Sequence, residues 1–288
     1  MTKLPKPILD AGVLNTPGVK KRVAAWPRRW RTISFLNRNL PRHGLARRLF
    51  EWCVFQRPWA RWHRFAYVPE YRDVFFEYIL TFFYRYPVTA GDTIVQIGAS
   101  NGEETARFSK AVGAGGRVIA IEPAPDNVSQ LIARFPQDGS GNVTVVPKAA
   151  AKSGGQLRFF LGQPKEGRLA DIPGDNLTYE WWGVEDHLNA ERYRGEVLVE
   201  ADTPVSILES AEVGPIDFVL VETNGTELEV VEALKPLLPK IKRVGARGHV
   251  SRDGVPTHQA IEAFLSAQGM TTFVTDEGMV LASHNIAD

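Results

Sequence analysis

The chain has little cysteine and no long apolar run. Of its 288 residues only Cys53 is cysteine, so an internal disulfide is excluded and nothing indicates an oxidising compartment. No uninterrupted apolar run reaches the roughly 18 residues that span a bilayer, and residues 1–21 lack the apolar core of a secretory signal. With 44% hydrophobic and 23% charged residues, the composition is typical of a soluble globular protein. We therefore expect a cytoplasmic location.

The net charge of +1 conceals an uneven distribution. Residues 1–90 hold 17 basic against 5 acidic side chains, a charge of +12, so the remainder carries −11. Five of the seven tryptophans also fall within these 90 residues. The sequence therefore predicts two regions: a basic, Trp/Arg-rich extension over residues 1–88 and a globular domain over residues 89–288.

Basic and aromatic side chains alternate along residues 26–86, where helices are expected at 45–55 and 70–86. Three interpretations stay open. The aromatics pack on the globular domain or on a protein partner. Alternatively, the segment binds an anionic membrane surface at its inner face, with Trp and Phe in the interface and Arg on phosphates. Nucleic-acid binding is disfavoured, because no nucleic-acid module accompanies the charge.

Residues 93–123, TIVQIGASNGEETARFSKAVGAGGRVIAIEP, predict a strand, a glycine turn, a helix and a second strand. The two β-branched runs are typical of strands buried on both faces of a parallel sheet. Gly98 and Gly102 bracket the first turn, where the missing Cβ lets backbone approach a ligand closely. Glu122 ends the second strand, where a carboxylate can accept hydrogen bonds from two ribose hydroxyls. The stretch indicates a nucleoside-binding βαβ unit.

Strands and helices alternate through the rest of the domain, which predicts a doubly wound α/β sheet with right-handed crossovers. Thr203 is the expected N-cap, and Pro204 the first residue, of a short helix. A terminal antiparallel hairpin is expected at 270–275 and 278–283. Further strands are expected at 142–146, 156–161, 197–200, 216–222 and 242–248, and further helices at 124–135, 204–210, 227–238 and 256–268.

The glycine spacing distinguishes between nucleoside ligands. Dinucleotide folds prefer Gly-x-Gly-x-x-Gly, whose backbone amides bind a pyrophosphate. The turn here, GASNG at 98–102, has two glycines at another spacing. It suits S-adenosylmethionine, which carries no phosphate, and disfavours a nicotinamide cofactor. The small residues at 149–151 follow the third expected strand, where they would let an adenine ring lie flat.

Over about residues 85–284 the chain resembles the FkbM family of S-adenosylmethionine-dependent methyltransferases. The matching pieces are GDTIVQIGASNG (91–102), GGRVIAIEPAPDN (115–127), NVTVVPKAAAKSGG (142–155) and IDFVLVETNGTELEVVEAL (216–234). The resemblance implies a Rossmann-like class I methyltransferase sheet, S-adenosyl-L-methionine as cofactor, and O-methylation of a hydroxyl-bearing acceptor such as a sugar or glycolipid.

Several charged positions depart from the family pattern. Gln96 stands where the family has an aspartate, Asn224 where it has a glutamate, and Arg247 where an acidic residue is frequent. These changes keep a second interpretation open. In it the domain is catalytically inactive and serves as a binding or assembly subunit of a protein or membrane complex.

The expected site residues fall into three groups. The cofactor group comprises Gln96, Gly98, Ser100, Asn101, Gly102 and Glu122. The candidate bases are Glu222 and His249, both at expected strand ends on the ligand side. The acceptor group comprises Trp181 and Trp182, in a long polar loop at 162–196 that is interpreted as a lid, and Asn224. Glu222, Asn224 and His249 could converge on a metal, yet no residue spacing demands one, and no metal is assigned.

Overall fold

The computed structural model describes residues 88–162, 177–178, 193–248, 251–252, 255–275 and 278–284, together with Leu45, Ala46, Leu49, Leu80 and Tyr84. The chain divides into two units, Met1–Pro87 and Val88–Asp288, and nearly all described residues belong to the second. The helices expected at 45–55 and 70–86 and most of the loop at 162–196 lie outside the described residues. Within the described part, no helix combines the length and the apolar character needed to cross a membrane.

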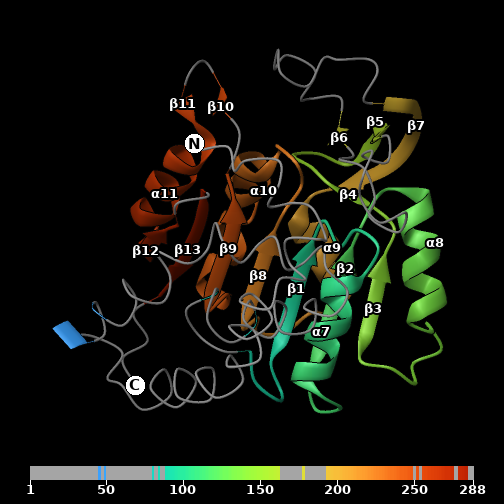
Figure 1. Ribbon diagram of the computed structural model, residues 1–288, viewed down its shortest axis with the longest axis horizontal. Helices are drawn as coiled ribbons and strands as arrows, with labels where there is room; N and C mark the ends of the chain where they lie inside the picture. Colours follow the sequence, from blue (N-terminus) through green and yellow to red (C-terminus); the bar gives the residue numbers. More distant parts are fainter. Residues whose placement is uncertain are drawn as a thin grey trace, which may run out of the picture. The chain divides into compact units, whose positions relative to one another are not determined.

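A seven-stranded sheet with the order β12-β13-β9-β8-β1-β2-β3 forms the centre of this unit (Figure 1). Its strands are parallel except β13, which is antiparallel to both neighbours. The predicted doubly wound, class I methyltransferase-like sheet with a terminal antiparallel hairpin is thereby confirmed. The strands are β1 (Thr93–Ile97), β2 (Arg117–Ile121), β3 (Val143–Val146), β8 (Phe218–Val221), β9 (Arg243–Arg247), β12 (Thr271–Val274) and β13 (Met279–Ser283).

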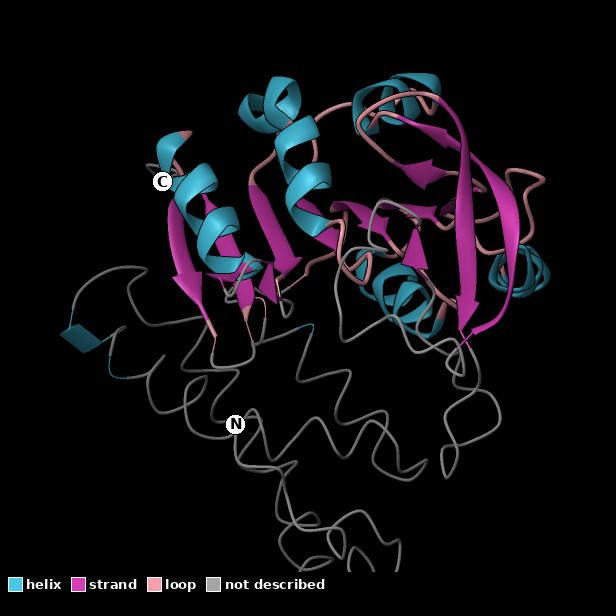
Figure 2. Ribbon diagram, turned by 90° about the horizontal axis from the view of Figure 1, so that it is seen from above, coloured by secondary structure: helices cyan, strands magenta, loops and turns pink. Residues whose placement is uncertain are grey.

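Helices cover both faces of the sheet, as Figure 2 shows. α7 packs on one face, where Phe108 meets Phe218 of β8 edge to face with ring centroids 6.2 Å apart. The other face carries the larger apolar cluster. The helices are α7 (Glu103–Val112), α8 (Pro125–Arg134), α9 (Pro204–Ser210), α10 (Glu227–Ala233), α11 (Thr257–Ala267) and the 3₁₀ helix η8 (Lys235–Lys240).

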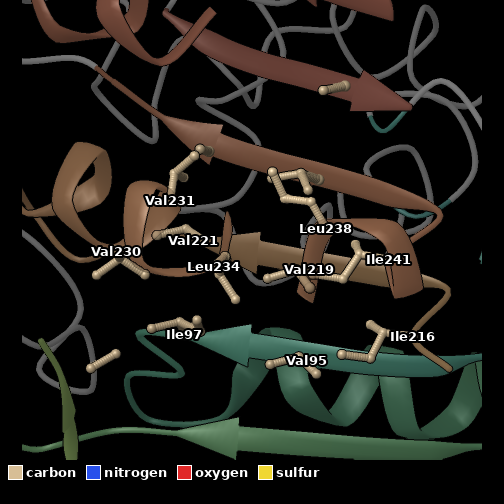
Figure 3. Packing of buried hydrophobic residues seen from close by; sticks show 14 of the residues in the cluster. Val95, Ile97, Ile216, Val219, Val221, Val230, Val231, Leu234, Leu238 and Ile241 are labelled. Atoms are coloured by element: carbon tan, nitrogen blue, oxygen red, sulfur yellow. The ribbon is translucent and has the colours of Figure 1, made fainter. Parts of the chain in front are cut away.

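The larger cluster joins alternate residues of the central strands to α9, α10 and α11. Val95 and Val219 from the sheet, Val230 from α10 and Leu234 directly after it are all fully buried and belong to this cluster (Figure 3). Each such side chain contributes about 1.5–3 kcal/mol by leaving water. The cluster thus holds the ends of β1 and β8 in register.

A second, four-stranded sheet with the order β4-β7-β5-β6 was not predicted. Strands were expected at 156–161 and 197–200, but their pairing with each other was not. The strand expected at 197–200 is also longer than expected. A short hairpin of β10 (Ser251–Arg252) and β11 (Val255–Pro256) was also missed. The strands of the second sheet are β4 (Ala149–Ala150), β5 (Gly155–Gly162), β6 (Leu177–Thr178) and β7 (Tyr193–Asp202).

Local expectations were confirmed at one helix and were wrong at two. The Thr203 hydroxyl accepts the Ser206 N–H at 3.1 Å, as expected of an N-cap. The single helix expected at 227–238 is instead α10 followed by η8, because prolines within η8 lack the N–H that continues an α-helix. The apolar pattern of the helix expected at 124–135 places Val128, Leu131, Ile132 and Phe135 on one face. In α8, however, Ile132 is 47% exposed, since Leu131 already faces the core and Ile132 is turned about 100° away.

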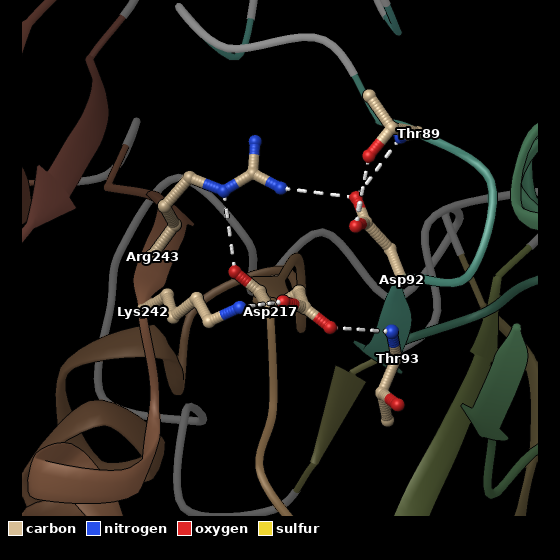
Figure 4. A network of polar contacts seen from close by, with 6 residues as sticks. All are labelled: Thr89, Asp92, Thr93, Asp217, Lys242 and Arg243. Carbon is tan, nitrogen blue, oxygen red and sulfur yellow. Dashed lines mark hydrogen bonds and ion pairs between the residues drawn. The ribbon is translucent and has the colours of Figure 1, made fainter. Parts of the chain in front are cut away.

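A polar network ties the amino-terminal ends of β1, β8 and β9 together (Figure 4). Asp217 accepts the Thr93 N–H at 2.8 Å and pairs with Lys242. Arg243 donates to the Asp217 carbonyl at 3.2 Å and pairs with Asp92 at 3.4 Å. These contacts hold together the amino-terminal ends of the three strands. The site described next lies at their opposite, carboxyl-terminal ends.

Candidate functional site

The candidate site lies at the topological switch point of the sheet, where the order of the strands reverses. From β1 the chain continues to β2 on one side, and β8 pairs with β1 on the other. The strand ends meet there: the Glu222 N–H donates to the Ile97 carbonyl, and the Gly98 N–H to the Ile121 carbonyl, each at 2.9 Å. Open α/β sheets bind ligands at such a switch point. A cavity of about 540 Å³, part of it open solvent, occupies this place.

Residues at or just after the ends of β1 and β2, and in the turn after β8, supply most of the cavity wall; α8, Lys148 and the second sheet supply the rest. The β1 and β2 ends contribute Ile97, Gly98, Ser100, Ile121, Glu122 and Pro123. The turn after β8 contributes Glu222, Thr223, Asn224 and Thr226, and the remaining wall comprises Asn127, Lys148, Ala149, Ala150 and Phe159. The structure thus brings together five expected residues: Gly98, Ser100, Glu122, Glu222 and Asn224.

Glu122 occupies the end of β2 with its side chain only 4% exposed. One oxygen accepts the Ser100 N–H at 2.8 Å, and the other accepts the Ala124 N–H at 2.9 Å and the Asn127 amide at 3.2 Å. Burial raises the pKa of this carboxyl, and the three N–H donors oppose part of the rise. A carboxylate offers about four acceptor positions, so Glu122 can accept at least one more hydroxyl from within the cavity.

Ser100 reaches Glu122 because the turn after β1 has a left-handed backbone. Gly98, Ser100 and Gly102 all have positive φ, of 90°, 51° and 82°. Gly102 faces α8 rather than the cavity: a Cβ there would lie 2.7 Å from Leu131 Cδ2. Asn101 Oδ1 accepts the Glu103 N–H at 3.4 Å. Asn101 and Gly102 are therefore placed in the turn and outside the cavity wall.

Gln96 lies in the interior, 2% exposed, and is not part of the cavity wall. Its Nε2 donates to Glu104 Oε2 at 3.1 Å and its Oε1 accepts the Thr105 hydroxyl at 2.7 Å. Both ends of the amide thus bind the first turn of α7. In this geometry Gln96 fixes α7 on β1, and a direct contact with a cofactor stays a prediction.

Three residues that sequence reasoning did not assign a role line the cavity beyond Glu122. Asn127 binds the Glu122 carboxylate. Lys148 pairs with Asp202 at 3.3 Å. Phe159, on β5, is 5% exposed and adds an aromatic surface beside Ala149 and Ala150. The small residues at 149–150 indicated this wall from the sequence. Phe159 could not be predicted, because it reaches the cavity only through the pairing of the second sheet.

The turn after β8 carries the opposite wall. Glu222 is half-buried, and its Oε1 lies 3.5 Å from Arg247 Nη1. Asn224 has a left-handed backbone with φ of 54°, which presents it at the cavity. Arg247, noted from the sequence as a departure from the family, is therefore the ion-pair partner of the expected base.

Glu227, the first residue of α10, was missed. It is fully buried, and its Oε1 accepts the Thr223 N–H at 2.9 Å. Burial, together with the nearby Glu222 charge, raises its pKa to about 7, although backbone N–H groups oppose the shift. Acidic residues are common in the first turn of a helix. Only the packing of α10 therefore shows that Glu227 is buried.

Three expected residues, His249, Trp181 and Trp182, lie outside the described residues. Among the residues that the structure describes, no group of three or more His, Cys, Asp or Glu side chains lies together as metal ligands do.

The strand order and the cavity at its switch point define a class I methyltransferase fold. The chain belongs to the FkbM methyltransferase family: the model for the methyltransferase FkbM domain matches residues 96–271, more than half of the chain. The resemblance drawn from the sequence is thereby confirmed. Comparison with curated proteins gives no match.

Solved structures similar to this chain are distant. An FkbM methyltransferase from Methylobacillus flagellatus KT is 16% identical, with a TM-score of 0.47 over 91% of this chain and 60% of its own. Aeropyrum pernix fibrillarin, in complex with natively bound S-adenosyl-L-methionine, is 13% identical, with a TM-score of 0.39 over 68% of each chain. A methyltransferase from Geobacter sulfurreducens is 13% identical, with a TM-score of 0.41 over 88% and 95%. The chain thus spans about three fifths of the first of these structures.

Proposed function

We propose that this chain is an S-adenosylmethionine-dependent O-methyltransferase whose acceptor is a hydroxyl group, such as that of a sugar or glycolipid. The observation that carries the proposal is Glu122, a buried carboxylate inside a cavity at the switch point of a methyltransferase sheet. Three N–H groups hold it in place, and it retains acceptor capacity for ribose hydroxyls.

The rest of the cavity fits such a nucleoside. Ala149, Ala150 and Phe159 offer a flat apolar wall for a purine ring. At Gly98 and Ser100 the backbone approaches the cavity without a large side chain, where the amino-acid portion of the donor would lie. When bound, the donor supplies an electrophilic methyl group on a positively charged sulfur.

Glu222 is the residue proposed to take the proton of the acceptor hydroxyl. Its carboxylate lines the cavity, and Arg247 stabilises the negative charge. Asn224, on the same wall, is proposed to orient the acceptor oxygen. His249 remains the second candidate base.

Calorimetry with S-adenosylmethionine and S-adenosylhomocysteine tests the proposal. Both are expected to bind, and Glu122→Ala is expected to weaken binding by about 100-fold or more, because hydrogen bonds to a charged group contribute about 1.5–3 kcal/mol each. Glu122→Gln, which retains the shape of the side chain, is expected to keep the fold. Glu200→Ala, which removes an exposed carboxylate from β7, is the control and should bind normally.

The two negative outcomes have different meanings. Absence of binding of both ligands to the wild type at millimolar concentration contradicts the enzyme proposal and favours the assembly-subunit interpretation. Full affinity in Glu122→Ala instead contradicts the placement of the ribose.

A further inference from the structure

The turn that links β8 to α10 contains buried oxygens with unmet hydrogen-bonding capacity. Thr223 Oγ1, Thr226 Oγ1 and Glu227 Oε2 are all buried and have no hydrogen-bond partner among the described residues. Buried polar atoms nearly always have a partner. Three such atoms within five consecutive residues indicate that the turn is completed by a proton, water or bound ligand.

This turn is part of the candidate site. Thr223 and Thr226 both line the cavity, as does Glu222 immediately before them. Glu227 is joined to this wall by the hydrogen bond from the Thr223 N–H to its Oε1. Glu227 itself is buried behind this wall, so a group at this end of the cavity meets Glu222 directly and Glu227 across the Thr223 backbone.

Among the described residues, an ion-pair partner is found for only one of the two carboxyls. Arg247 pairs with Glu222, and the charge of Glu222 acts on Glu227, whose pKa is about 7 mainly because of burial. Within the described part of the chain, the turn thus has two carboxyls for one ion-paired cation, Arg247, when both carboxyls are ionised. The elements that pack against α10 carry further titratable or charged residues, namely His258 and Glu262 on α11, Glu209 on α9, and Lys235 and Lys240 in η8.

We propose that Glu222 and Glu227 form a proton-linked cation subsite, in which Glu227 holds a proton until a positively charged group binds at the turn and displaces it. The inference rests on the proposed function, since the cation is the sulfonium of the methyl donor. The product of methyl transfer is a neutral thioether. The subsite therefore favours the donor over the product.

The charges balance through the reaction. One proton leaves Glu227 when the cationic donor binds. On methyl transfer the sulfur keeps the electron pair of the broken S–C bond and loses its charge, while the acceptor oxygen gains the methyl group and gives up its proton. That proton restores the protonated carboxyl pair. The pair thus begins and ends the cycle with one proton.

Proton release measured by calorimetry tests the inference without an acceptor. The full chain is titrated at pH 7 with S-adenosylmethionine and with S-adenosylhomocysteine, each in phosphate and in Tris, whose ionisation enthalpies differ. The sulfonium ligand is expected to release about half a proton more than the thioether, because a group with a pKa near 7 is half protonated at this pH. Its affinity relative to the thioether should rise about 10-fold from pH 6 to pH 8.

Glu227→Gln is expected to remove both the extra proton and the pH dependence of this preference, while both ligands still bind. Glu209→Gln removes an exposed carboxyl on α9 and should change neither. Equal proton release by the two ligands, or a preference that keeps its pH dependence in Glu227→Gln, overturns the inference and leaves the proposed function intact. If Glu227→Gln does not fold, the wild-type comparison alone decides. Failure of both ligands to bind contradicts the proposed function as well.

Discussion

The Glu222 carbonyl oxygen lies only 2.1 Å from the point where residue 98 would carry a Cβ. Gly98 also has a φ of 90°, a conformation that other residues adopt only with strain. This contact joins the end of β1 to the end of β8, so the two walls of the cavity are held against each other by a glycine.

Gly98→Ala is expected to lower the free energy of unfolding by about 1–3 kcal/mol or more, because a strained backbone and a clash with backbone atoms add. It should also remove ligand binding, since β8 must move away from β1. Urea unfolding and calorimetry with S-adenosylhomocysteine check both effects. Gly115→Ala is the control: a Cβ there meets nothing within 4 Å, and its stability should change by less than about 0.5 kcal/mol. Normal binding in Gly98→Ala would contradict the prediction.

The raised pKa of Glu227 predicts how stability depends on pH. Its pKa rises from 4.5 to about 7 on folding, so between these values the folded state binds more protons than the unfolded state. Stability therefore falls as pH rises through this window. A fully buried group with this shift makes the wild type less stable at pH 8 than at pH 5 by up to about 3 kcal/mol.

Urea unfolding at pH 5, 6, 7 and 8 measures this effect. Glu227→Gln cannot ionise and should gain stability relative to wild type across the same range. Glu122 also has a raised pKa, so a residual slope of the same sign is expected in the variant. If the free energy of unfolding depends on pH in the same way in the wild type and in Glu227→Gln, Glu227 does not titrate in this range.

The basic aromatic segment at 26–86 predicts binding to anionic membranes. The full chain should float with vesicles that contain anionic lipid and not with neutral vesicles, and binding should weaken at 1 M salt, where the screening length falls to about 3 Å. Replacing Arg28, Arg29 and Arg31 with glutamine should reduce flotation. Replacing the exposed Lys110, Lys235 and Lys240 removes the same charge from the globular unit and should not. Flotation indifferent to lipid charge and salt would favour packing on a protein surface instead.

The local sequence pattern was sufficient to predict the part of the candidate site near β1 and β2. β1 and α7 lie where residues 93–123 predict the first strand and the helix, because glycines bracket the helix and the strand is a short β-branched run. Glu122 could be placed because an acid at a strand end has a defined position in a parallel sheet.

Long-range packing decided the features that the sequence did not predict. Gln96 binds α7 because Glu104 and Thr105, in the first turn of the helix, reach back to β1. Glu227 is buried because α10 packs on the sheet, although its sequence position is that of an ordinary solvated helix start. Neither the Gln96 contacts nor the burial of Glu227 follows from the hydrophobic periodicity of the sequence.

The second sheet supplies the last prediction, through two neighbouring phenylalanines on β5. Phe159 and Phe160 are both buried, at 5% and 8% exposure, and successive strand residues point to opposite faces. Only Phe159 lines the cavity. Phe159→Leu is expected to weaken S-adenosylhomocysteine binding about 5-fold, because an aromatic contact with a purine contributes about 1 kcal/mol beyond its area.

Phe160→Leu removes the same ring from the opposite face and serves as the matched control. Both variants should lose comparable stability in urea unfolding, since each replaces a buried aromatic with a smaller apolar side chain. Only Phe159→Leu should change the affinity measured by calorimetry. Equal affinities in the two variants would mean that the purine does not stack on β5, and that Ala149 and Ala150 alone form its wall.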